Sequence, residues 1–255
     1  VTSTSLTGAS GADTIVITGR VGSTTVDGAA GNDSLAFAST GPAFVTSSLE
    51  GGAGNDTLSL SGSSETSTIG GGAGNDSILL TTATSSSITL GEGIDTLFAS
   101  GELFKSTITS GGGNNYLTLG ANFVSSSVTA AANGDTILIG GDSNSSTITG
   151  GAGADVLALT STTGVANLST VAMGEGADSV SFSGNVSGST IGVGAGNDTL
   201  SVTGNINNGT ITTGIATAQK QSVITLGEGD NYAILGGVVS SASITAGAGA
   251  DTITI

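Results

Sequence analysis

Apolar and polar residues alternate along the chain in short runs, and glycine-rich segments separate the runs. In residues 51–60 (GGAGNDTLSL) a glycine-rich segment ends at Asp56, and apolar residues follow two and four positions later. Another apolar residue, Leu49, stands seven positions before this aspartate. Alternation with a period of two is typical of a β-strand with one buried face. The pattern therefore predicts a short strand on each side of a tight turn.

The same pattern recurs along the chain, most often every 20 residues, as from Asp56 to Asp76. All twelve copies keep the apolar positions seven residues before and two and four residues after the residue that ends the turn. A unit of two short strands cannot bury its own apolar face, but stacked copies can. The residues that end the twelve turns are Asp13, Asp33, Asp56, Asp76, Asp95, Asn115, Asp135, Asp155, Asp178, Asp198, Asn231 and Asp251.

This periodicity predicts an all-β fold, a parallel β-solenoid or β-roll of about twelve coils with roughly 20 residues each. We expect two strands per coil and a single edge formed by Gly-Asp turns. The prediction is one continuous solenoid over residues 1–255, with an irregular insertion near residues 205–220. Within the insertion, residues 209–214 repeat the pattern of a first strand, so the segment forms either a loop or an additional half coil.

The charge balance limits the classes of molecule that the protein can be expected to bind. The chain has 19 acidic residues and only 3 basic ones, for a net charge of -16, which disfavours nucleic acids and anionic membranes and favours cations. It has no histidine and no cysteine, which excludes imidazole and thiolate metal sites and most nucleophile–base catalysis. No apolar run is long enough to span a membrane. We therefore expect no enzymatic activity, no nucleic-acid partner and no membrane insertion.

Stacking would place the turn aspartates along one edge, where neighbouring carboxylates repel each other by about 1 kcal/mol in water. Ca²⁺ is the cation that fits best, because it accepts six to eight oxygen ligands in loose geometry and the turns offer carboxylates beside backbone carbonyls. The alternative is that Gly, Asn and Asp form tight turns without any metal. Turn chemistry alone does not account for the glutamates of the GEG turns, Glu92, Glu175 and Glu228.

The segments GGAGNDTL (51–58) and GGAGNDSI (71–78) resemble the calcium-binding nonapeptide of the RTX (repeats-in-toxin, haemolysin-type) family. The resemblance implies a β-roll with Ca²⁺ held between successive turns. Here the turn occurs once per coil, so only one edge is expected to carry metal, and the sites at Asn115, Asn231 and the AANGD segment (131–135) are expected to be weak or empty. The residues that the resemblance makes metal ligands are Asp13, Asp33, Asp56, Asp76, Asp95, Asp135, Asp155, Asp178, Asp198, Asp251, Gly52, Gly54, Gly72, Gly74, Gly151 and Gly153.

These features together predict a calcium-stabilised structural protein, secreted and located at the bacterial cell surface. The sequence begins and stops inside a repeat, so we expect copies to stack end to end into a filament or surface layer. Cell-surface polysaccharide is a further candidate partner. The alternatives are a spacer module of a large RTX adhesin and the carrier region of a secreted RTX protein.

Two surface patterns leave further alternatives open. Hydroxyl residues recur eight and nine positions before the turn aspartate, as at Thr68 and Ser67. They indicate either small side chains on a narrow solenoid or an ice-binding face similar to that of RTX-type antifreeze adhesins, whose GTGND turns carry Thr where Ala or Glu stands here. A partial apolar stripe indicates either scattered exposed residues or a lateral contact; it consists of Val16, Leu79, Phe98, Leu138 and Ile234.

Overall fold

The computed structural model is built of short parallel β-strands. It describes residues 1–39, 41–162, 165–196, 198–203, 206–207, 210–213, 219–220, 223–225, 232–235, 239–240, 243–245, 250 and 252–254. The chain forms two compact units, Val1–Ala121 with Ser126–Val128 and Asn122–Ser125 with Thr129–Ile255, and each is described by itself. In the part of the chain that the structure describes, no helix is long and apolar enough to cross a membrane.

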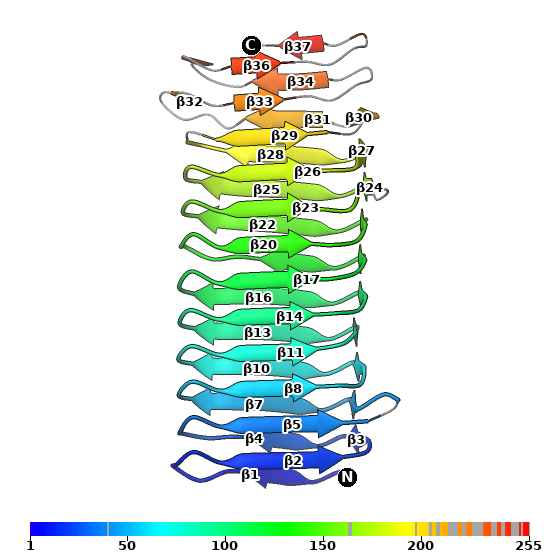
Figure 1. The fold of residues 1–255 in the computed structure, drawn as a ribbon, viewed down its shortest axis with the longest axis vertical. Coiled ribbons are helices and arrows are strands. Elements are labelled where there is room, and N and C mark those ends of the chain that lie inside the picture. Colours follow the sequence, from blue (N-terminus) through cyan, green and yellow to red (C-terminus); the bar gives the residue numbers. More distant parts are fainter. Residues whose placement is uncertain are drawn as a thin grey trace. The chain divides into compact units, whose positions relative to one another are not determined.

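The coils of the first unit contribute strands to three parallel sheets (Figure 1). The first sheet contains β1 (Ser5–Thr7), β4 (Thr25–Asp27), β7 (Ser48–Ala53), β10 (Thr68–Ala73), β13 (Ser87–Glu92) and β16 (Thr107–Gly112). The second sheet contains β2 (Thr14–Thr18), β5 (Ser34–Ala38), β8 (Thr57–Leu60), β11 (Ser77–Leu80), β14 (Thr96–Ala99) and β17 (Tyr116–Leu119). The third sheet contains β3 (Val21–Gly22), β6 (Phe44–Val45), β9 (Ser64–Glu65), β12 (Ala83–Thr84) and β15 (Leu103–Phe104).

The second unit has the same three kinds of strand, and β19 (Ser127–Thr129) contains residues of both units. Its first-sheet strands are β22 (Thr147–Ala152), β25 (Thr170–Glu175), β28 (Thr190–Gly194), β31 (Thr210–Thr213), β34 (Tyr232–Leu235) and β37 (Thr252–Thr254). Its second-sheet strands are β20 (Thr136–Ile139), β23 (Val156–Leu159), β26 (Ser179–Phe182), β29 (Thr199–Val202), β33 (Val223–Thr225) and β36 (Ser243–Thr245). Its third-sheet strands are β18 (Phe123–Val124), β21 (Ser143–Asn144), β24 (Val165–Asn167), β27 (Asn185–Ser187) and β30 (Ile206–Asn207), and β32 (Gln219–Lys220) pairs separately with β35 (Val239–Ser240).

The predicted parallel β-solenoid is confirmed within each unit, but the prediction of two strands per coil is wrong. Each regular coil has a third strand, in the segment that the sequence pattern indicated as a second turn. Several of these strands have only two residues, which is too short to show an alternating pattern. One residue of the pair still points into the core, and Val21 and Phe44 are fully buried. The third sheet therefore closes the side of the core that a two-sheet arrangement would leave open.

The apolar positions that define the repeat form continuous buried columns. In the first sheet Leu49, Ile69 and Ile88 are register partners on successive strands, and all three are fully buried. The second sheet stacks Leu58 against Ile78 in the same way. Burial of such side chains contributes about 1.5 to 3 kcal/mol each. The columns thus hold consecutive coils in one register and bring the glycine-rich turns into line.

The insertion near residues 205–220 adds the strand β31 to the first sheet. The strands that follow it lie in the opposite sheet from the one that their sequence pattern indicates. The strand β31 pairs with β28 in the first sheet, and β33, which has the sequence of another first strand, pairs with β29 in the second sheet. The strand β34 then returns to the first sheet beside β31. Both kinds of strand carry apolar residues at alternate positions, so either kind can occupy either sheet. Most of residues 204–218 lie outside the described residues, so the choice between a loop and an additional half coil stays a prediction.

Candidate metal-binding edge

The turn aspartates form a hydrogen-bonded ladder between the first and second sheets of each unit. For every turn aspartate from Asp13 to Asp178, the backbone N–H donates to Oδ1 of the equivalent residue in the next coil. In the first unit, Asp56 N–H donates to Asp76 Oδ1 at 2.8 Å, and Asp76 N–H donates to Asp95 Oδ1 at 2.7 Å. In the second unit, Asp155 N–H donates to Asp178 Oδ1 at 2.9 Å. In each of these coils the Oδ1 atom therefore joins its own coil to the preceding one.

The other carboxylate oxygen has no hydrogen-bond donor in most of these turns. The Oδ2 atom is buried and has no partner at Asp33, Asp56, Asp76, Asp155 and Asp178. An isolated buried carboxylate oxygen is costly, because burial removes the water that would solvate its charge. A hydrogen-bond donor or a cation beside Oδ2 would offset this cost.

The backbone conformation four residues before the aspartate determines whether Oδ2 has a donor. In the turns of Asp13 and Asp135 the residue at this position is Ala9 or Ala131, and its N–H donates to Oδ2. Where Oδ2 has no partner, the residue four positions earlier has a positive φ, as Gly72 does at 115°. Glycine adopts this conformation readily. A residue in this conformation leaves the carboxylate without that backbone donor; it is Ala29 in the turn of Asp33 and a glycine in the other turns without a donor.

The space beside Oδ2 also contains a backbone carbonyl of the next coil. A Cβ atom added at Gly71 would lie 2.6 Å from Asp76 Oδ2 and would overlap the carbonyl oxygen of Leu90. The same two kinds of oxygen converge beside Gly51, where they belong to Asp56 and Gly71. Two acceptors that face the same small space, with no donor between them, form the oxygen environment that a hard cation accepts.

Burial raises the pKa of several carboxyl groups on this edge. The pKa of Asp76, Asp155 and Asp178 rises to about 6, chiefly through desolvation. In each, a hydrogen bond from the backbone N–H of the preceding coil's aspartate lowers the pKa, and the charge of a neighbouring carboxylate raises it. At neutral pH a group with a pKa of about 6 is mainly ionised, so a proton does not fully satisfy Oδ2.

The turn of Asn115 shows what a satisfied site contains. Its Oδ1 accepts the N–H of Asp95 at 2.8 Å, as an aspartate would. Its second atom is the Nδ2 amide nitrogen, which donates to the carbonyl oxygens of Gly112 at 3.3 Å and Gly113 at 3.2 Å. These two carbonyls belong to the residues three and two positions before Asn115. In this turn a donor therefore stands where the other turns have an acceptor.

The structure brings most of the sequence-predicted residues to this edge. Asp33, Asp56, Asp76, Asp95, Asp135, Asp155, Asp178 and Asp198 are buried there, Asp13 is partly buried, and Asp251 lies outside the described residues. The predicted glycines Gly52, Gly54, Gly72, Gly74, Gly151 and Gly153 all have a positive φ. Their role as ligands stays a prediction. The glycines at the start of the GGAGND turns, Gly51 and Gly71, were missed, although the doubled glycine at this position was a signal that could have indicated them.

The oxygen atoms at the edge fit Ca²⁺. Among the described residues no three His, Cys, Asp or Glu side chains gather in one place, so a cation here would depend on backbone carbonyls in addition to the carboxylates. Carboxylate and carbonyl oxygens suit Ca²⁺, which tolerates irregular coordination, better than Zn²⁺, which prefers sulfur and nitrogen ligands. The unpartnered Oδ2 atoms and the carbonyls beside them are the features that make this fit.

The corner between the third and first sheets carries a second ladder, made of serines. The backbone N–H of Ser47 donates to Ser67 Oγ at 3.1 Å, and Ser67 N–H donates to Ser86 Oγ at 3.2 Å. The Ser67 hydroxyl in turn donates to the carbonyl of Glu65 at 2.8 Å. We name this corner the serine corner; its buried serines are Ser47, Ser67, Ser86, Ser106 and Ser126 in the first unit and Ser146, Ser169 and Ser189 in the second. The sequence pattern detected these hydroxyls but not that they point inward.

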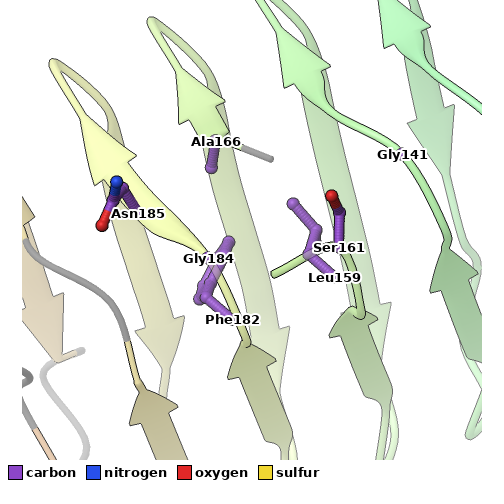
Figure 2. A pocket seen from close by; sticks show the side chains of 7 residues that line it. All are labelled: Gly141, Leu159, Ser161, Ala166, Phe182, Gly184 and Asn185. Atoms are coloured by element: carbon purple, nitrogen blue, oxygen red, sulfur yellow. The ribbon is translucent and has the colours of Figure 1, made fainter. Parts of the chain in front are cut away.

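A hollow in the second unit, between the ends of the second-sheet and third-sheet strands, is too small for a substrate. Its volume is about 10 Å³, which is about the space of a single water molecule. Figure 2 shows the lining residues, which are Gly141, Leu159, Ser161, Ala166, Phe182, Gly184 and Asn185.

Comparisons with known proteins support the fold. No protein-family model and no curated protein matches the chain, so its resemblance to RTX repeats rests on the short turn motif. A solved structure that does match is the X-ray crystal structure of a hyperactive, Ca²⁺-dependent, β-helical antifreeze protein from an Antarctic bacterium. The two chains are 20% identical, the TM-score is 0.62, and the match covers 98% of this chain and 83% of that one. At this identity the similarity shows that this chain shares the fold of a β-helical protein.

Proposed function

We propose that the protein is a calcium-stabilised, non-catalytic β-solenoid that serves a structural role at the bacterial cell surface. The single observation that carries the proposal is the row of buried carboxylate oxygens without donors at Asp33, Asp56, Asp76, Asp155 and Asp178. Ca²⁺ bound at these turns would cancel the mutual repulsion of the carboxylates and join consecutive coils. The calcium dependence of the structurally similar antifreeze protein supports this part of the proposal.

The finer part of the proposal is that copies of the chain assemble into a filament or surface layer outside the cell. The second sheet of the first unit carries an exposed apolar pair, Leu79 and Phe98, which are register partners on β11 and β14. The two side chains are 39% and 44% exposed, and Tyr116 on the next strand is 45% exposed. Such a patch supports a lateral contact between copies.

Negative-stain electron microscopy in millimolar Ca²⁺, and again after chelation with EGTA, tests both parts. The proposal expects filaments or sheets in Ca²⁺ that dissolve after chelation. Separate short particles in Ca²⁺ would contradict self-assembly and favour a spacer module or a carrier region. Assemblies and circular dichroism that are both indifferent to EGTA, with no bound calcium by elemental analysis, would contradict the calcium role.

A second candidate function is binding to ice, and the outer face of the first sheet is the observation that favours it. At one outward position per strand this face carries only Thr or Ser, in register on adjacent strands; these residues are Thr25, Ser48, Thr68, Ser87 and Thr107 in the first unit and Thr147, Thr170 and Thr190 in the second. A parallel sheet spaces such hydroxyls about 4.8 Å apart. A regular hydroxyl array of this kind can order water, and the structurally similar protein is described as an antifreeze protein.

Thermal hysteresis and ice-affinity measurements test this second candidate. If the face binds ice, the double variant Thr68→Tyr with Thr107→Tyr loses the activity, because bulky rings break the flat array. Leu79→Tyr, on the exposed face of the second sheet, is the matched control and keeps the activity. No thermal hysteresis in the wild-type protein with bound calcium would rule the candidate out.

A further inference from the structure

The turns of Asp76 and Asn115 in the first unit differ in the partners of the side chain that ends the turn. The ladder bond is identical in the turns of Asp76 and Asn115, because each Oδ1 accepts the N–H of the preceding coil's aspartate. The two side chains differ in their second polar atom. That atom is an acceptor without a donor at Asp76 and a donor with two acceptors at Asn115.

The orientation of the Asn115 amide follows from its hydrogen bonds. The N–H of Asp95 can only donate, so the atom 2.8 Å away is the amide oxygen. The nitrogen must then face the carbonyls of Gly112 and Gly113, which can only accept. Every atom of the amide group therefore has a chemically matched partner.

We propose that the Asn115 side chain takes the place of a bound cation, so that its turn is a permanently closed, calcium-independent site within the ladder. In the aspartate turns whose Oδ2 has no donor, such as that of Asp76, the positive partner between Oδ2 and the backbone carbonyls is a Ca²⁺ ion. At Asn115 the two N–H groups of the amide supply that positive partner from the chain itself. This inference rests on the proposed calcium role and specifies which turn does without the ion.

A reciprocal pair of substitutions tests the inference, because Asp and Asn have nearly the same shape. Asn115→Asp replaces the amide nitrogen by an acceptor and should add a calcium ion per chain. It should also lower the melting temperature in EGTA, since the new carboxylate oxygen then faces two carbonyls without a donor. Asp76→Asn should bind fewer calcium ions than the wild type by the same amount, with a melting temperature in EGTA no lower than that of the wild type.

Calcium per chain is measured by equilibrium dialysis with elemental analysis, and folding by circular dichroism. Asn144→Asp, on the third sheet and away from the aspartate edge, controls for added charge and should leave the calcium content unchanged. If Asn115→Asp folds in Ca²⁺ and gains no ion, or if Asp76→Asn keeps the full calcium content, the inference is wrong while the calcium role stands. If the wild-type chain itself binds no calcium, the proposed function fails.

Discussion

The aspartate edge and the serine corner solve the same structural problem with different chemistry. At both places a backbone N–H donates to a side-chain oxygen in the next coil, as Asp56 N–H does to Asp76 and Ser67 N–H does to Ser86. The serine hydroxyl uses its own hydrogen to bond a nearby carbonyl, so the corner is neutral and satisfied. The carboxylate has no hydrogen, and its second oxygen stays without a donor.

Because only the carboxylate needs an added positive partner, the aspartate edge can respond to an ion and the serine corner cannot. The serine corner contributes the same stability in any ionic condition, because none of its groups titrates or needs an ion. If calcium binds as proposed, the aspartate edge gains stability when the ion occupies the space beside the Oδ2 atoms that have no donor. Removal of calcium should therefore loosen the solenoid from one edge while the serine corner stays closed.

The largest effect should come from a methyl group placed in the aspartate turn. Gly74 has a φ of 125°, and a Cβ there would overlap the carbonyl oxygen of Gly54, which is part of the backbone and cannot move aside. Gly74→Ala should cost about 3 kcal/mol or more. The counterpart at the serine corner is Thr66→Gly, where the φ of 49° already suits glycine, so this change should be nearly neutral. Urea unfolding of both variants in Ca²⁺ measures the loss of unfolding free energy for each. Equal losses would contradict the expected difference between the two edges.

A smaller effect should come from the serine ladder. Ser67→Ala leaves the buried N–H of Ser47 without an acceptor and should cost about 1 to 3 kcal/mol. Because no ion takes part, the loss should be the same in Ca²⁺ and in EGTA. Asp76→Ala should instead cost more in Ca²⁺ than in EGTA, since it removes a ligand as well as a hydrogen bond. A calcium-dependent loss for Ser67→Ala would show that the two ladders are coupled.

A further effect should be the pH dependence of the calcium-free protein. The pKa of Asp76, Asp155 and Asp178 is about 6 in the folded chain, above the ordinary value of 3.8. The folded state then binds more protons than the unfolded state, so stability is highest below pH 4 and falls as the pH rises from about 4 through 6. In EGTA the melting temperature should decrease over this range, whereas saturating Ca²⁺ should reverse the trend because it binds the ionised carboxylates. A melting temperature that rises with pH in EGTA would contradict the assignment.

The sequence predicted the parts of the fold that repeat with a clear period. The column of turn aspartates and the apolar columns at Leu58 and Leu49 were predictable, because strands of four or more residues alternate visibly and a 20-residue period fixes the stacking. The third sheet was not, since strands as short as Val21–Gly22 and Phe44–Val45 carry too few residues to show a pattern.

The candidate site was predictable in composition but not in its details. Sequence reasoning identified the aspartates as candidate ligands, yet it could not show that one oxygen of the carboxylate already accepts a hydrogen bond from the preceding coil. The inward direction of Ser67 depends on the left-handed conformation of Thr66, which the residue type does not reveal. Similarly, the sequence pattern does not show that β31 pairs with β28 and that β33 then pairs with β29 in the second sheet.

Thermal unfolding of the wild-type chain at pH 7.5, in saturating Ca²⁺ and in EGTA, measures how much calcium stabilises the fold. Each site at a calcium concentration 100-fold above its dissociation constant adds about 2.7 kcal/mol, so several sites together should raise the melting temperature by roughly 20 °C. We expect this large difference in melting temperature between the two conditions. Equal melting temperatures, with no calcium retained by the protein after dialysis, would contradict it.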